Sequence, residues 1–286
     1  MINHGGIYMK IAIIPTTGGE DPFRGMETAV KLGVEGVHIP AYGGKLNLAG
    51  KTREERIKTR ERIQTYGLEV SALIGWGGDV DLGEEKNLRE NIEWGKKLNE
   101  TAVDVANGLW MAHVGIMPDD ESNPKWARFV ASLKELSQHG EEIGATLALE
   151  TGPEPPVKIR KMIETINSPA LRINFDPANL LLWPPTVYKR RGIPFDYESA
   201  MESFDPVKGL RVLIPYVVHA HAKDSRLDPD GKAEEVPLGT GMTNWEALHE
   251  IFKENNYQGY YAIEREAGED AMGDVKKAVE FLRKLP

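Results

Sequence analysis

Four side chains able to bind a metal ion each close a short apolar segment of the sequence. Glu150 ends ATLALE and Asp176 ends ALRINFD, while His221 ends YVVHAH and Glu264 ends YYAIE. A carboxylate at the end of an apolar strand is costly to bury unless another group compensates its charge. Three carboxylates and one imidazole form a hard, mostly oxygen ligand set, which suits Mn²⁺, Mg²⁺ or Co²⁺ best, with Zn²⁺ as an alternative. These residues predict one divalent metal ion and an enzyme that depends on it.

A salt bridge that closes the rim of the fold is the structural alternative for Glu150 or Glu264. It explains one such carboxylate better than a group of three, because three negative groups without a cation repel one another. Lys223 lies two residues after His221, so it points to the same face of that strand and is placed to neutralise part of the charge. The residues alone leave both interpretations open, and we favour the metal site.

Three further histidines lie in apolar segments. His113 and His38 each end one, and each is expected to contact the substrate or to lie beside the metal ion. His219 shares a strand face with His221. We interpret it as a hydrogen-bonded core histidine that supports the site rather than as a ligand.

Other residues could shape a substrate pocket. Trp110, Trp76 and Trp183 are candidates to line it, with burial in the core as the alternative. The loop 239–241, Gly-Thr-Gly, offers backbone N–H groups to a phosphate, but a turn before the helix expected at Trp245 is the use that we favour.

Eight short apolar segments alternate with amphipathic helical patterns along the chain. The expected strands are 10–15, 36–40, 68–74, 109–114, 146–150, 171–176, 217–222 and 260–264. The helical patterns include 53–66, 86–106, 125–143, 157–166, 245–255 and 274–282. Repeated strand–helix units favour parallel strands covered by helices, and eight units favour a closed barrel over an open sheet. We therefore predict an α/β fold, a single (β/α)8 TIM barrel whose strand ends bring the four ligands to one rim.

Residues 9–286 are expected to form this one domain, and residues 1–8 a disordered tail. Between about 180 and 203 the unit after the sixth strand is longer, with Trp183, Tyr188 and a basic run at 189–191. Long connections on this rim often carry lids, specificity loops or subunit contacts. We expect this rim segment to cover the metal site, and a surface loop with a few buried aromatic side chains is the alternative.

Composition excludes several functional classes. The 286-residue chain has a formal net charge of −9 and no sustained basic block, which argues against nucleic acid as a partner. It has no cysteine, so thiolate chemistry and disulfides are excluded. No apolar run approaches the roughly 20 residues that span a bilayer, and residues 1–8 lack the pattern of a signal peptide. We expect a cytoplasmic protein without a membrane partner.

Five motifs in order resemble the xylose isomerase-like TIM barrel superfamily of sugar isomerases, sugar-phosphate isomerases and epimerases. They are ALET at 148–151, NFDPAN at 174–179, VHAHAKD at 218–224, PLGTGMTNWEAL at 237–248 and GYYAIERE at 259–266. The resemblance extends from Met9 to the C-terminus. It implies a sugar or keto-sugar as substrate and a homo-oligomer, either a dimer or a tetramer.

The resemblance to ketose 3-epimerases implies roles for individual residues. Glu150, Asp176, His221 and Glu264 match their metal ligands, and the two glutamates also match the catalytic acid and base. The side chains placed to bind substrate are His113, Trp110, Asn179, Lys223 and Arg226. Two positions differ, because those epimerases have a histidine in place of Asn179 and Arg226 matches their arginine only approximately.

The implied reaction is metal-dependent sugar isomerisation or epimerisation, by proton abstraction next to a ketose carbonyl through a metal-stabilised enediolate. A carbon–oxygen lyase or dehydratase acting on a keto-sugar, an inosose or a 3-keto-glycoside begins with the same step and is the alternative. More remote alternatives are a metal hydrolase resembling endonuclease IV, and a barrel whose metal is structural.

Overall fold

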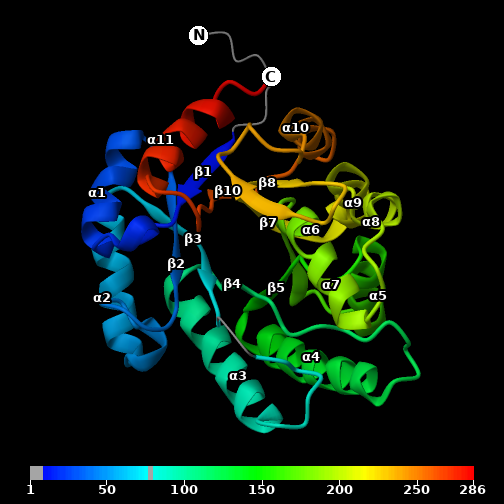
Figure 1. The fold of residues 1–286 in the computed structure, drawn as a ribbon. Coiled ribbons are helices and arrows are strands. Elements are labelled where there is room, and N and C mark those ends of the chain that lie inside the picture. The colour runs from blue at the N-terminus through cyan, green and yellow to red at the C-terminus, as the bar shows by residue number, and fades with distance from the viewer. Residues whose placement is uncertain (1–8, 77–79) are drawn as a thin grey trace.

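A closed barrel of parallel strands forms the centre of the molecule (Figure 1). The structure, a computed structural model of the chain, describes residues 9–76 and 80–286, so the tail predicted at 1–8 lies outside the described residues. The barrel strands are β1 (Lys10–Ile13), β2 (Gly36–Pro40), β3 (Glu69–Ile74), β4 (Leu109–Ala112), β5 (Thr146–Glu150), β6 (Leu171–Phe175), β7 (Val217–Ala222) and β10 (Tyr260–Ile263). They follow the order β1-β10-β7-β6-β5-β4-β3-β2, and every neighbouring pair is parallel. The predicted (β/α)8 barrel is therefore confirmed.

Helices surround this barrel on its outside (Figure 1). The longer ones are α1 (Pro22–Leu32), α2 (Arg53–Gln64), α3 (Leu88–Val105), α4 (Pro124–Ile143), α5 (Pro156–Ile166), α9 (Pro206–Leu213), α10 (Trp245–Glu254) and α11 (Ala271–Leu282). Side-chain caps begin several of them: Asp21 accepts hydrogen bonds from two N–H groups of α1, and Thr52 forms a reciprocal capping box with Glu55. Such caps satisfy N–H groups that a helix leaves without internal partners. None of the described helices is both long and apolar enough to cross a membrane.

Helix α4 illustrates how the sequence directs the packing. The apolar side chains that recur along it are buried against the barrel, namely Trp126, Phe129, Leu133 and Leu136. Burying each such side chain contributes roughly 1.5–3 kcal/mol. Asn123 caps the first turn through the Lys125 N–H, and Gly144 ends the helix in the left-handed conformation with φ of 79°. The spacing of the apolar residues therefore determines which face of α4 is buried, and the two caps determine where the helix begins and ends.

Two segments contain secondary structure that the sequence analysis did not assign. The rim segment expected at about 180–203 is largely helical. Its helices are α6 (Asn179–Leu182), α7 (Pro184–Arg191) and most of α8 (Tyr197–Phe204). After β7 the chain forms an antiparallel hairpin of β8 (Asp224–Leu227) and β9 (Ala233–Val236), which the prediction lacked. Its turn is closed by the Asp228 N–H, which donates to the Lys232 carbonyl, and Gly231 adopts φ of 83° there.

Candidate metal centre

The four predicted ligands lie together at the rim where β5, β6, β7 and β10 end. Nδ1 of His221 lies 2.9 Å from Oε1 of Glu150 and 3.1 Å from Oε2 of Glu264. The same nitrogen lies 3.5 Å from Oδ2 of Asp176. Each of the four residues offers one ligand atom, and these atoms all lie within 4.8 Å of one another. The structure thus gathers the four candidate side chains around one point.

Two buried atoms at this point lack well-directed hydrogen bonds. Oδ1 of Asp176 accepts from the N–H groups of Ala178 at 2.8 Å and Asn179 at 3.0 Å, so the backbone fixes the carboxylate. Its other oxygen, Oδ2, and Nδ1 of His221 have no hydrogen-bond partner among the described residues. Buried polar atoms without partners are rare in folded proteins, and an ion is one of the groups that satisfies them. The side chains present therefore fit a divalent cation.

The electrostatics of His221 and Asp176 point the same way. Burial lowers the pKa of His221, but the carboxylates of Glu264 and Glu150 outweigh it and hold that pKa well above its usual range. Burial raises the pKa of Asp176, and the nearby cationic side chains do not fully offset it. The imidazolium of His221 and the ammonium of Lys223 together do not balance the three carboxylates, so a divalent ion would supply the missing positive charge.

The two glutamates have different surroundings. Burial raises the pKa of Glu150, but His113 and His221 outweigh it, so the net shift is downward. The pKa of Glu264 lies well below its usual range because His221 and Lys223 outweigh burial. Both carboxyls are therefore ionised near neutral pH, as ligands or as a general base require.

A buried ion-pair network stands behind Glu264. Lys223 is 3% exposed, and its Nζ lies 3.0 Å from Oε2 of Glu264. It also contacts the carboxylate of Glu266 and lies 3.7 Å from Glu235. Arg265 in turn pairs with Glu235 at 2.6 Å. Sequence reasoning missed Glu235 and Arg265, because Glu235 lies on the unpredicted strand β9, whose polar sequence gives no strand signal.

His38 and His219 lie beneath the four ligands. Both are fully buried, so His38 lies beside the proposed metal ligands and does not reach a substrate pocket. Burial, helped by the neighbouring His221, lowers the pKa of His38 to about 3. Burial and the neighbouring His38 lower the pKa of His219 well below its usual range. Both rings are therefore neutral near pH 7.

A cavity of about 580 Å³ opens above the four ligands. Glu150 and Glu264 lie in its wall, and the other lining side chains include Thr17, Tyr42, Trp76, His113, Asn179, Trp183 and Lys223. This combination of aromatic walls and a few convergent polar groups is typical of small-molecule sites. The cavity is large enough for a monosaccharide next to the ligand atoms.

The sequence and the fold are similar to those of known proteins. A family model described as xylose isomerase-like TIM barrel matches residues 26–285. The chain belongs to the xylose isomerase-like TIM barrel family. The chain is also similar to the L-ribulose-5-phosphate 3-epimerase UlaE of Escherichia coli (strain SMS-3-5 / SECEC), with 26% identity over 290 residues, covering 97% of this chain and 93% of the relative.

Solved structures agree with membership of the xylose isomerase-like family. A xylose isomerase domain protein from Planctomyces limnophilus superposes with a TM-score of 0.78 at 27% identity, over 99% of this chain and 98% of that one. A D-psicose 3-epimerase determined in the presence of D-fructose gives a TM-score of 0.71 over 97% and 99% of the two chains, and its 13% identity shows the fold alone. The similarity to the 3-epimerase UlaE over nearly the whole chain supports the predicted class of enzyme, an isomerase.

Three of the predicted substrate-binding residues line the cavity of this xylose isomerase-like barrel. Nε2 of His113 lies 3.2 Å from Oε2 of Glu150. Asn179 directs Nδ2 toward Oε1 of the same carboxylate at 3.4 Å. Nζ of Lys223 lies 3.0 Å from Oε2 of Glu264. Their binding roles stay predictions, but their positions allow contact with a ligand at the rim.

The other two residues predicted to bind substrate, Trp110 and Arg226, are not among the described residues that line the cavity. Trp110 is fully buried, and its Nε1 donates to Oδ1 of Asn99 at 2.6 Å, so it packs beneath the cavity instead of lining it. The guanidinium of Arg226 is exposed on the hairpin and donates to the Thr240 carbonyl at 2.6 Å. The tryptophans that do line the cavity are Trp76 and Trp183.

The glycine loop at 239–241 serves as a turn. Oδ2 of the buried Asp224 accepts from the N–H groups of Gly239 at 3.0 Å and Gly241 at 2.9 Å, and Oδ1 accepts from the Thr243 hydroxyl at 2.8 Å. Because these N–H groups are already used, the loop does not offer them to a phosphate. The turn interpretation is therefore the better one.

Proposed function

We propose that this chain is a divalent-metal-dependent sugar epimerase or isomerase that moves a proton at the carbon beside a ketose carbonyl. One observation carries the proposal: two carboxylates, Glu150 and Glu264, approach Nδ1 of His221 where two buried ligand atoms lack hydrogen bonds. A cation together with two nearby carboxylates provides what such a proton transfer needs, namely stabilisation of the developing oxyanion and a general acid–base pair.

The proposal assigns roles to the residues around the cavity. Glu150, Asp176, His221 and Glu264 would hold the divalent ion, Mn²⁺, Mg²⁺ or Co²⁺, which supplies positive charge that polarises the carbonyl of the substrate. One glutamate removes the proton beside the carbonyl, and the other delivers a proton, to the opposite face in an epimerase. His113 and Asn179 orient Glu150, whereas Lys223 keeps Glu264 ionised.

The proposed substrate class is a ketose or a phosphorylated ketose. The 26% identity with an L-ribulose-5-phosphate 3-epimerase over nearly the whole chain supports this class. A lyase or dehydratase would use the same first step, so the fate of the substrate must be measured. An inverted centre indicates an epimerase, a shifted carbonyl an isomerase, and loss of water or an aglycone a lyase.

The test is hydrogen exchange in D₂O with a panel of ketoses, ketose phosphates, inososes and 3-keto-glycosides. A true substrate acquires deuterium beside its carbonyl when Mn²⁺ is present and not after chelation. Glu150→Gln and Glu264→Gln each slow this exchange by about 10²–10⁴-fold, since that is the usual contribution of general acid–base catalysis. Glu234→Gln, on the exposed side of the hairpin, is the matched control and keeps the wild-type rate. Turnover without deuterium incorporation or a primary isotope effect would exclude the mechanism.

A further inference from the structure

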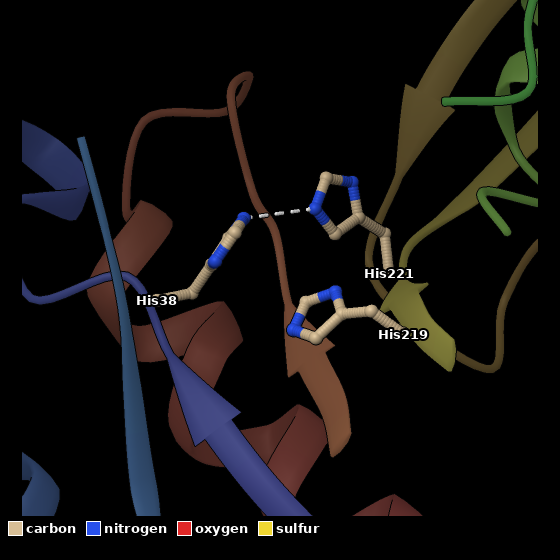
Figure 2. A group of neighbouring side chains, drawn as sticks. All are labelled: His38, His219 and His221. Carbon is tan, nitrogen blue, oxygen red and sulfur yellow. Dashed lines mark hydrogen bonds between the residues drawn. The ribbon is translucent and has the colours of Figure 1, made fainter. Parts of the chain in front are cut away.

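Three buried histidines form a cluster that includes His221, one of the proposed metal ligands. Figure 2 shows His38 from β2 facing His219 and His221 from β7. The ring centroid of His38 lies 4.8 Å from that of His219 and 5.1 Å from that of His221. Nitrogens of the three rings lie close enough together to hold a metal ion of their own. Their hydrogen bonds, however, indicate another role.

The first link of the cluster is a backbone carbonyl. Nδ1 of His38 lies 2.9 Å from the carbonyl oxygen of Ala72 on β3. A carbonyl oxygen can only accept a hydrogen bond, so Nδ1 of His38 must carry the hydrogen. The other nitrogen of the ring, Nε2, is left to meet a different partner.

The second link joins the two histidines. Nε2 of His38 lies 3.2 Å from Nε2 of His221, the contact drawn as a dashed line in Figure 2. Nδ1 of His221 faces the three carboxylates, so it is the nitrogen whose lone pair can bind the metal ion. The ring hydrogen of a metal-bound His221 then lies on Nε2, which donates it to Nε2 of His38. We infer that His38 is a positioning residue, which sets the tautomer and ring orientation of His221 so that Nδ1 is the metal ligand.

His219 provides the contrast within the same cluster. Its Nδ1 contacts Oδ1 of Asn174 at 2.8 Å, and its Nε2 contacts the hydroxyl of Ser71 at 3.1 Å. A second metal ion bound by the three rings would have to break these bonds as well as the one between His38 and His221. The cluster is therefore a hydrogen-bonded support, and the protein binds one metal ion per chain.

The inference rests on the proposed metal site, and metal affinity tests the two separately. Mn²⁺ binding is measured by competition with a chelator for the wild type, His38→Phe, His38→Gln and His219→Phe. His38→Phe keeps the ring volume but removes the acceptor, so the dissociation constant rises by about 10–100-fold, as is typical when the partner of a metal-bound histidine is lost. His38→Gln retains an acceptor oxygen and restores most of the affinity. His219→Phe lowers the melting temperature but leaves affinity within a few-fold of wild type.

A spectroscopic measurement on the wild type does not depend on any variant folding. In two-bond ¹H–¹⁵N correlation spectra of the Zn²⁺-loaded protein, His221 should bind zinc through Nδ1 and carry its hydrogen on Nε2, and His38 should carry its hydrogen on Nδ1. Zinc bound through Nε2 of His221, or His38→Phe with unchanged affinity, would overturn the inference while leaving the metal site intact. Two metal ions per chain in the wild type and one in His38→Phe would instead identify the three histidines as a second metal site. A wild type that binds no metal contradicts the inference together with the proposed function.

Discussion

Oε2 of Glu264 lies between two basic groups, 3.0 Å from Nζ of Lys223 and 3.1 Å from Nδ1 of His221. Glu150 has no comparable lysine among its described contacts and instead meets His113 and Asn179. The two glutamates of the proposed acid–base pair are therefore unequal. A fixed ammonium beside Glu264 favours its ionised form and makes it the weaker base of the pair.

Lys223→Met tests this asymmetry. Losing the ammonium leaves Glu264 and Glu266 without their shared cation, so the pKa of Glu264 rises. We expect the acid limb of the kcat/KM profile to move to higher pH by about 1–3 units at saturating metal, the usual effect of one close opposite charge. Breaking a buried pair also costs about 3–5 kcal/mol of stability, which thermal unfolding measures. Lys232→Met, on the exposed hairpin turn, is the control, and equal profiles for the two variants would contradict the role of Lys223.

Asp176→Asn separates metal binding from folding. The asparagine carbonyl can still accept from the N–H groups of Ala178 and Asn179, but an NH₂ group replaces Oδ2. We expect metal affinity to fall by at least about 10–100-fold, because an NH₂ group is a donor and cannot bind a cation. The melting temperature of the metal-free protein should stay close to that of wild type. Asp228→Asn, on the hairpin, is the matched control, and full occupancy of Asp176→Asn by elemental analysis would remove Asp176 from the site.

The strands and the four rim residues could be predicted because each depends on local sequence. A charged residue closing an apolar run marks the end of a barrel strand, and the alternation of side chains placed His219 on the same strand face as His221. In the structure His219 is buried, and its Nδ1 lies 2.8 Å from Oδ1 of Asn174 on the neighbouring strand. The alternation of side chains and the positions of the strand ends were therefore enough to predict the four rim residues without knowledge of long-range contacts.

The remaining features depend on contacts between distant parts of the chain. The role of His38 follows from its approach to His221, 183 residues away in sequence. Glu235 reaches Lys223 only because the hairpin folds over the rim. Helices α1 and α9 were not among the helices expected from apolar periodicity. Each nevertheless begins with a local signal, an N-cap aspartate followed by proline in the first turn, at Asp21-Pro22 and Asp205-Pro206. Trp110 was expected to line the substrate cavity but is fully buried. The sequence of a strand does not indicate whether an aromatic side chain packs in the core or lines a cavity.

Glu154 makes stability depend on pH. It is 4% exposed, its Oε1 accepts from the Met117 N–H at 2.7 Å, and burial raises its pKa from 4.5 to about 7. The contribution of Glu154 to the free energy of unfolding is fully present below about pH 4.5, where Glu154 is protonated in both the folded and the unfolded chain. It is lost as the pH rises to about 7, because the carboxyl ionises at lower pH in the unfolded chain than in the folded one. About two and a half pKa units correspond to roughly 3 kcal/mol.

Glu154→Gln should remove this dependence. The amide is neutral at every pH and its oxygen can still accept from Met117, so we expect the variant to be more stable than wild type by roughly 3 kcal/mol at pH 8 and equal to it near pH 4. Urea unfolding across this range measures the difference. Glu198→Gln, at an exposed position, controls for the change in net charge. Parallel stability curves for wild type and Glu154→Gln would show that the Glu154 carboxyl ionises normally.

Trp183 tests whether the rim segment shapes the substrate cavity. Deleting residues 186–193 would be a poor test, because it removes the buried side chains of Val187 and Tyr188 from α7. Trp183 instead lies in the cavity wall, with its ring centroid 5.9 Å from that of His113. A Cβ atom on Gly152 would come within 3.0 Å of Nε1 of Trp183, so the backbone leaves room for this ring.

Trp183→Ala should therefore weaken substrate binding and spare the metal. Losing one aromatic wall is expected to raise KM roughly tenfold, about 1.4 kcal/mol, with a smaller change in kcat and an unchanged metal dissociation constant. Trp94→Ala, a half-buried tryptophan of α3, is the control for loss of a large side chain. Steady-state kinetics at saturating metal measure both variants. A tenfold loss of metal affinity in Trp183→Ala would place the ring at the metal ligands, and unchanged kinetics would show that α7 and its preceding turn cover the rim without contacting substrate.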